Sequence, residues 1–95
     1  MRWRVELSKR VEKAVVDLPL EVQSAFWLLV KEVSQHGPLR FNWSHYGRLH
    51  PKQDNRYHCH IKAGRPTYVV CWEVKDKRIK LVEVYYAGTH EKAPY

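Results

Sequence analysis

The break at Pro19 is the feature that most constrains the fold, because it separates two amphipathic helices early in the chain. Before the break, Ser8 can cap a helix whose apolar residues follow the spacing of one helical face. After it, a second apolar stripe runs to His36, where Gly37 and Pro38 give a stop signal. The stripes consist of Val11, Ala14, Val15 and Leu18, and of Val22, Ala25, Phe26, Leu29, Val30 and Val33. We expect a helical hairpin that lies on a sheet.

The rest of the chain contains several segments with the character of strands. These segments are residues 3–7, 56–62, 67–74 and 78–86. Residues 39–55 are polar, aromatic and basic without a clear period, so we expect an ordered loop there. The order strand, two helices, three strands predicts a single α+β domain over residues 1–95, with the last three strands in an antiparallel meander.

Length and cysteine content exclude several classes of protein. The 95 residues suffice for one domain, and the longest apolar run, residues 25–30, is too short to span a membrane as a helix. Met1 leads directly into alternating residues, so we expect no signal peptide. Two cysteines cannot form a disulfide framework. We therefore expect a cytoplasmic protein that does not associate with membranes.

Positive charge is concentrated in one part of the chain. Lysine and arginine number 17 against 10 acidic residues, which gives a net charge of +7. Residues 40–80 hold ten of the bases and three of the acids, so they carry the whole excess. Aromatic residues are interleaved with these bases, and aromatic rings can stack on nucleobases. This segment predicts a surface that faces nucleic acid; a basic surface that serves only solubility is the alternative.

Residues 56–62 place two histidines on one face of a strand. Strand alternation turns His58, His60 and Lys62 to one side. It turns Tyr57, Cys59 and Ile61 to the other, toward the helices. A third histidine, His90, follows the last predicted strand. Imidazoles titrate near neutral pH, so a pair can act as general base and general acid. The set fits metal-free cleavage of a phosphodiester bond by the 2′-hydroxyl of RNA. The alternative is that these histidines only occupy solvated positions on the open face of the strand.

A metal site is a second interpretation of these histidines. His58 and His60 could supply two ligands, with His90 or His50 as a third. However, the chain has no Cys-x-x-Cys or His-x-x-x-His spacing, and its two cysteines are most simply small hydrophobic residues on strands. We therefore predict neither a metal nor a cofactor.

Six short motifs follow one another in a specific order. They are residues 7–9, 18–19, 46–49, 56–60, 68–74 and 86–91, and together they cover nearly the whole chain. Their order and spacing resemble those of the RelE/ParE toxin superfamily, the small basic toxins of bacterial toxin–antitoxin pairs. The resemblance implies ribosome-dependent mRNA cleavage for the RelE-like branch or gyrase poisoning for the ParE-like branch. In both branches a cognate antitoxin neutralises the toxin, and the basic segment favours an acidic one.

The resemblance also implies roles for individual residues. RelE-like toxins hold basic catalytic residues at the positions that match His58 and His60, so one of these is the expected base. The position that matches His90 contacts the scissile phosphate or protonates the leaving group, and the position that matches Tyr95 stacks on the substrate. The resemblance thus implies an endoribonuclease whose partners are the ribosome, mRNA and an antitoxin.

One position departs from the family pattern. Members that use lysine and arginine place an arginine where this chain has Val69. The residues expected to bind substrate and to hold phosphate charge are Arg48, Arg56, Lys62 and Arg65. A gyrase poison, or a catalytically degenerate toxin that only binds its antitoxin, are the alternatives.

Overall fold

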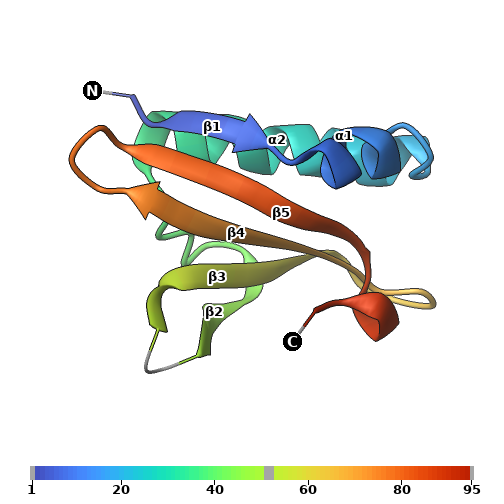
Figure 1. The fold of residues 1–95 in the computed structure, drawn as a ribbon. Helices are drawn as coiled ribbons and strands as arrows, with labels where there is room; N and C mark the ends of the chain where they lie inside the picture. Colours follow the sequence, from blue (N-terminus) through green and yellow to red (C-terminus); the bar gives the residue numbers. More distant parts are fainter. Residues whose placement is uncertain (1, 51–52, 95) are drawn as a thin grey trace.

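Two helices cover one face of a five-stranded sheet (Figure 1). This computed structural model describes residues 2–50 and 53–94, so Tyr95, a predicted site residue, lies outside the described residues. In chain order the elements are β1 (Arg4–Leu7), α1 (Lys9–Val15), α2 (Leu20–His36), β2 (Ser44–His50), β3 (Gln53–Lys62), β4 (Tyr68–Asp76), β5 (Leu81–Thr89) and the short 3-10 helix η1 (His90–Lys92). The predicted α+β class is confirmed, with one strand more than expected.

The helical hairpin forms where the sequence predicts it. The Ser8 side chain caps α1 by accepting a hydrogen bond from the backbone N–H of Val11 at 3.2 Å. Helix α1 is shorter than predicted, because it ends before Leu18, which lies in the turn that precedes Pro19. At the far end of α2, Gly37 has a φ of 98°, a backbone conformation that glycine adopts without steric cost.

The sheet has the strand order β1-β5-β4-β3-β2. Strand β1 pairs with β5 in parallel, and the other neighbours are antiparallel, so the predicted meander of the last three strands is confirmed. The prediction of a loop over residues 39–55 is wrong, since this region contains β2 and the start of β3. Register shifts between Ser44 and Gly47 and between Arg48 and His50 interrupt the alternation of β2, which is why no period is visible in the sequence.

The last predicted strand, residues 78–86, begins too early. The Asp76 carboxylate accepts hydrogen bonds from the backbone N–H groups of Arg78 and Ile79, at 2.8 and 3.2 Å. These bonds close a turn after β4. Strand β5 therefore starts at Leu81 and continues to Thr89.

The core lies between the helices and the sheet. Phe26 and Leu29 of α2 pack there against Tyr57, Cys59 and other side chains of the strands. Each large apolar side chain buried in this way stabilises the fold by about 1.5–3 kcal/mol. Tyr57 and Cys59 are buried on this side, so the predicted parity of β3 is confirmed for them. His58 and His60, which alternate with them, face the other side of the sheet.

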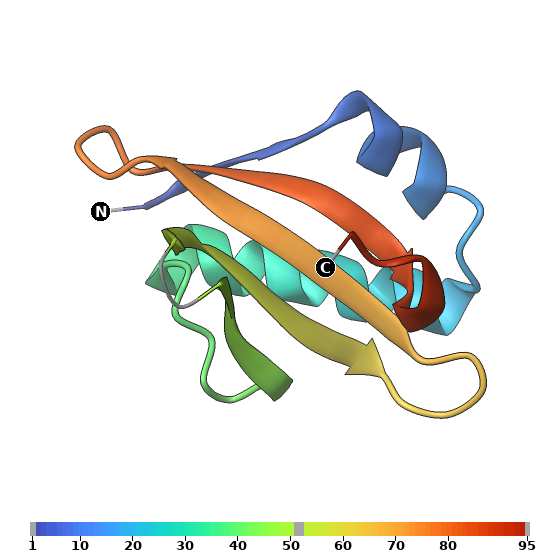
Figure 2. The same cartoon turned by 60° about the horizontal axis from the view of Figure 1, so that its bottom comes forward.

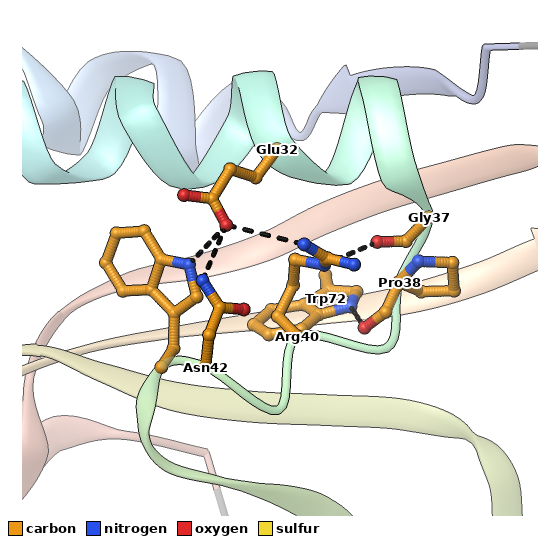
Figure 3. A network of polar contacts seen from close by, with 7 residues as sticks. Glu32, Gly37, Pro38, Arg40, Asn42 and Trp72 are labelled. Carbon is orange, nitrogen blue, oxygen red and sulfur yellow. Dashed lines mark hydrogen bonds and ion pairs between the residues drawn. The ribbon is translucent and has the colours of Figure 1, made fainter.

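Glu32 holds the connection between α2 and β2 in place (Figure 3). One of its oxygens accepts hydrogen bonds from Asn42 at 3.0 Å, from the Trp43 indole at 2.9 Å and from Arg40 at 3.4 Å. These bonds, above all those from Asn42 and Trp43, hold the pKa of the Glu32 carboxyl below its usual range. The loop that leads into β2 is thus fixed on the helix layer.

Candidate active site

Four histidines gather on the face of the sheet opposite the helices, and we call them the histidine cluster. His45 comes from β2, His58 and His60 from β3, and His90 from η1. The His45 and His60 rings stack with their centroids 4.2 Å apart and their planes at 20°. The His60 and His90 centroids are 5.4 Å apart, at 76°. The structure therefore brings the three predicted histidines together and adds a fourth.

The chain after β5 turns across the sheet face that lies opposite α2, and this turn carries His90 to the cluster (Figure 2). The backbone N–H of His90 donates to the Thr67 carbonyl at 2.8 Å, next to the start of β4. Within β5, the Tyr86 hydroxyl donates to the Thr89 carbonyl at 2.6 Å. The Tyr86 ring lies so close to Gly88 that a β-carbon there would be 2.8 Å from the hydroxyl oxygen. We call this arrangement of Tyr86, Gly88 and Thr89 the Tyr86 latch.

His45 is the member of the cluster that the sequence does not predict as a site residue. It has a φ of 53°, in the left-handed region that residues other than glycine seldom adopt. Its Nδ1 atom lies 2.9 Å from the Ser44 hydroxyl oxygen. Strained backbone of this kind is concentrated at functional sites. The irregular register of β2 hides this position from any reading of periodicity.

The surroundings of His58 and His60 disfavour their charged forms. Burial lowers the pKa of His58 below the ordinary 6.5, and repulsion from His90 and His45 lowers it further. Burial also lowers the pKa of His60, followed by repulsion from His45, His90 and His58. Both rings are therefore mostly neutral at pH 7 and can accept a proton.

A cavity of about 630 Å³ lies beside the cluster. It is lined by His60, Gly64, Arg65, Pro66, Thr67, Thr89, His90 and Glu91. Two imidazoles and a guanidinium group thus border the same space, which suits an anionic substrate. Glu91 adds a carboxylate to the lining. The sequence pattern does not predict it as a site residue, although it directly follows His90.

The other predicted cations lie in different places. Arg56 shares the strand face of His58, where its guanidinium lies 5.5 Å from the centre of the Tyr85 ring and 3.6 Å from the Glu73 carboxylate. Lys62 does not continue the histidine face as expected. A register shift follows His60, and the Lys62 ammonium lies 3.0 Å from the carboxylate of Glu21 in α2.

Arg48 also lies away from the histidine cluster. It pairs with Tyr57, whose side chain is buried on the helix side of the sheet, and it lines a separate cavity beside Trp3. Of the four predicted phosphate-binding residues, the structure therefore brings only Arg65 to the cavity beside His60 and His90.

Val69 occupies the position where the resemblance leads us to expect an arginine. It pairs with His60 on one side and with Gly88 on the other, and its exposed fraction is 0%. Directly paired residues share a face of the sheet, so this aliphatic side chain lies beneath the cluster. Cys71 is buried two residues farther along β4, and burial raises its thiol pKa to about 12, as it does for Cys59. Both thiols behave as small hydrophobic groups.

Within residues 2–50 and 53–94, no group of three or more histidine, cysteine or acidic side chains is placed to hold a metal ion. No helix in the same ranges is long and apolar enough to cross a membrane.

The chain is similar in structure to several toxins. No family model matches the sequence, and no curated protein matches it. A chain of the archaeal RelE–RelB complex from Pyrococcus horikoshii OT3 has a TM-score of 0.76 and 19% identity, over 98% of this chain and 100% of that one. A mutant E. coli RelE toxin in the free state has a TM-score of 0.71 and 16% identity, over 96% of this chain and 86% of that one. A chain of the YoeB–YefM complex from Staphylococcus aureus has a TM-score of 0.67 and 12% identity, over 95% of this chain and 99% of that one. The fold is therefore that of RelE and YoeB, as the motif order predicts.

Proposed function

We propose that the chain is the toxin of a type II toxin–antitoxin pair and an endoribonuclease that cleaves translated mRNA on the ribosome. The observation that carries the proposal is the histidine cluster beside a cavity that also holds Arg65. The shared fold with RelE and YoeB supports it. A substrate of this kind places the protein in the cytoplasm.

In the proposed reaction, His60 is the general base. Its neutral ring accepts the proton of a ribose 2′-hydroxyl, and the 2′-oxygen attacks the adjacent phosphorus. His90, which borders the same cavity, donates a proton to the 5′-oxygen as the bond from phosphorus to that oxygen breaks. The products are a 2′,3′-cyclic phosphate and a 5′-hydroxyl, and the step needs neither a metal nor a cofactor. Each proton transfer contributes about 10²–10⁴ to the rate.

Arg65 is the residue we assign to the charge that develops on the phosphate. The aliphatic Val69 is buried at the position that pairs with His60, whereas Arg65 lines the cavity with His60 and His90. Arg56 is farther along the strand, beside the Glu73 carboxylate. His58 and His45 support the base by keeping a proton off His60 before substrate binds. Tyr95 stays a proposed stacking residue on the resemblance alone.

The proposed partners are the ribosome, mRNA and an acidic antitoxin. Two of the similar structures are complexes, RelE with RelB and YoeB with YefM, and this supports a dedicated protein partner. The net charge of +7 supports both an RNA and an acidic peptide as ligands.

The test is induced expression in bacteria, followed by primer extension on a reporter mRNA. We expect growth to stop and the reporter to be cut only while it is translated. The variants His60→Gln and His90→Gln abolish cutting, whereas His36→Gln, at the exposed end of α2, keeps it. Growth arrest with intact mRNA and damaged DNA would indicate a gyrase poison instead. Harmless expression of a folded protein would indicate a degenerate toxin.

A further inference from the structure

A second cavity, of about 460 Å³, lies at the opposite end of β4 from the histidine cluster. The first cavity borders Thr67, next to the start of β4, whereas the second borders Val74 and Lys77 at the end of that strand. The second cavity also lies on the other side of the sheet, because Val74 and Tyr57 belong to the core beneath the helices. An occupant of this cavity would therefore not touch the catalytic residues proposed above.

The walls of this cavity are held rigidly. The backbone N–H of Trp3 donates to the Ser34 carbonyl at 2.8 Å, and the Ser34 hydroxyl donates to the Trp3 carbonyl at 3.2 Å. The Pro38 carbonyl accepts the indole N–H of Trp72 at 3.1 Å, and the Gly37 carbonyl accepts from Arg40 at 3.0 Å (Figure 3). A preformed wall loses little conformational entropy when a ligand binds.

The rim of the cavity is basic. Two cations, Arg48 and Lys77, border it beside the imidazole of His36, and none of the described residues that line it is acidic. Asp76 binds backbone N–H groups in the turn after β4, and Glu32 binds the loop before β2. An apolar pocket with a cationic rim attracts an apolar group that is flanked by negative charge.

Tyr57 offers little surface to a nucleobase. The Tyr57 side chain is 4% exposed, and its ring stacks between those of Tyr46 and Trp72, at 6.0 and 6.2 Å. The ammonium group of Lys80 lies 5.9 Å from the centre of the Trp3 ring. Leu39 is 42% exposed and Trp3 is half-buried, so the accessible apolar wall combines an aliphatic side chain with part of one indole. These features favour a protein side chain over a stacked base.

We propose that this cavity is the docking site for an acidic segment of the partner protein. One large apolar side chain enters between Trp3, Leu39 and Val74, and carboxylates on either side of it meet the cations of the rim. The inference rests on the protein partner of the proposed function and adds the place where that partner is anchored. Docking here fixes the partner to the toxin without closing the catalytic cavity, so a short docking segment alone does not inhibit cleavage.

The experiment measures the binding of synthetic peptides by calorimetry. The probe has a central phenylalanine flanked by glutamates, and the matched peptides carry alanine at the centre or glutamine in place of glutamate. We expect the probe to bind and each matched peptide to bind at least about tenfold more weakly. In the protein, Lys77→Glu and Leu39→Ser should each weaken binding about tenfold. The controls Arg78→Glu and Phe41→Ser, which change exposed side chains outside the cavity, should leave it unchanged.

Several outcomes would overturn the inference. Absence of probe binding would do so, and so would equal losses in Lys77→Glu and Arg78→Glu, which would indicate attraction by net charge alone. Displacement of the probe by a single-stranded RNA oligonucleotide would assign the cavity to RNA. The same variants are assayed for mRNA cleavage, and circular dichroism confirms that they fold. Cleavage without probe binding refutes the docking site only, and probe binding without cleavage refutes the nuclease only.

Discussion

The Tyr86 latch is one of the contacts that hold His90 over the cluster, beside the bond from the His90 backbone N–H to the Thr67 carbonyl, and it can be tested with Gly88→Ala. A β-carbon at position 88 would lie 2.8 Å from the Tyr86 hydroxyl oxygen and 3.1 Å from the ring carbon that bears it. The ring must therefore swing away, and its hydrogen bond to the Thr89 carbonyl breaks. Since Thr89 directly precedes His90, the imidazole loses one of the contacts that fix its position.

The expected cost follows from the two contacts that change. Loss of the hydrogen bond costs about 0.5–1.5 kcal/mol of unfolding free energy. Crowding by the extra methyl group costs about 1–3 kcal/mol more. Tyr86→Phe alone loses only the first amount. In the double variant the 2.8 Å contact no longer exists, so its cost falls short of the sum of the two single variants by about 1 kcal/mol.

Urea denaturation of the four proteins measures this coupling. Gly47→Ala is the matched control, because a β-carbon at that strand position would lie 3.6 Å from the nearest atom, Nε2 of His58, which is an ordinary contact. In the cleavage assay we expect Gly88→Ala to lower kcat with little change in KM. Adding Tyr86→Phe to Gly88→Ala should restore part of kcat, because it removes the hydroxyl that the new methyl group crowds. Strictly additive free energies, or equal losses of kcat in Gly47→Ala and Gly88→Ala, would refute the latch.

Three further predictions concern charge. His45→Ala removes a repulsion that lowers the pKa of His60, so the acidic limb of the cleavage rate should move up toward pH 6.5; an unchanged pH–rate profile contradicts this. Glu32 has a lowered pKa, so its stabilisation is complete above its ordinary value of 4.5 and is lost as the pH falls through the lowered pKa. Glu32→Ala should cost about 1.5–3 kcal/mol at pH 7 and much less near pH 2, which urea denaturation at the two pH values checks. Arg65→Ala should lower kcat about 10²-fold while Arg78→Ala does not, and equal activities would remove Arg65 from the site.

Much of the fold could be predicted from local periodicity. The helical stripes on both sides of Pro19 and the alternation around His58 and His60 depend only on neighbouring residues, and both survive in the structure. Strand β2 could not be predicted, because two register shifts erase its period and His45 has a left-handed backbone. Its pairing with β3 is local, since His50 pairs with Gln53, but the two shifts leave no alternation in the sequence by which to recognise it.

Part of the candidate site could also be predicted from local pattern, and part depends on how the strands pair. His58, His60 and His90 could be identified as titratable side chains at strand positions, whereas the stacking of His45 on His60 depends on the pairing of β2 with β3. Lys62 follows the same alternation in the sequence, but the register shift after His60 and the carboxylate of Glu21 direct it to the helix layer. Charges on long side chains are placed by their partners across the fold rather than by strand parity.

The parallel pairing of β1 with β5 bears on the order in which the protein can fold. Arg4 pairs with Leu81, so nearly the whole described chain must be present before this edge of the sheet closes. Contacts of such long sequence separation form late and slow the folding of a domain. The same late strand carries Tyr86 and leads directly into His90. A nascent chain that has completed β3 therefore holds the proposed base, His60, but neither a closed sheet nor the proposed acid, His90. A chain in this state cannot cut the message from which it is being translated.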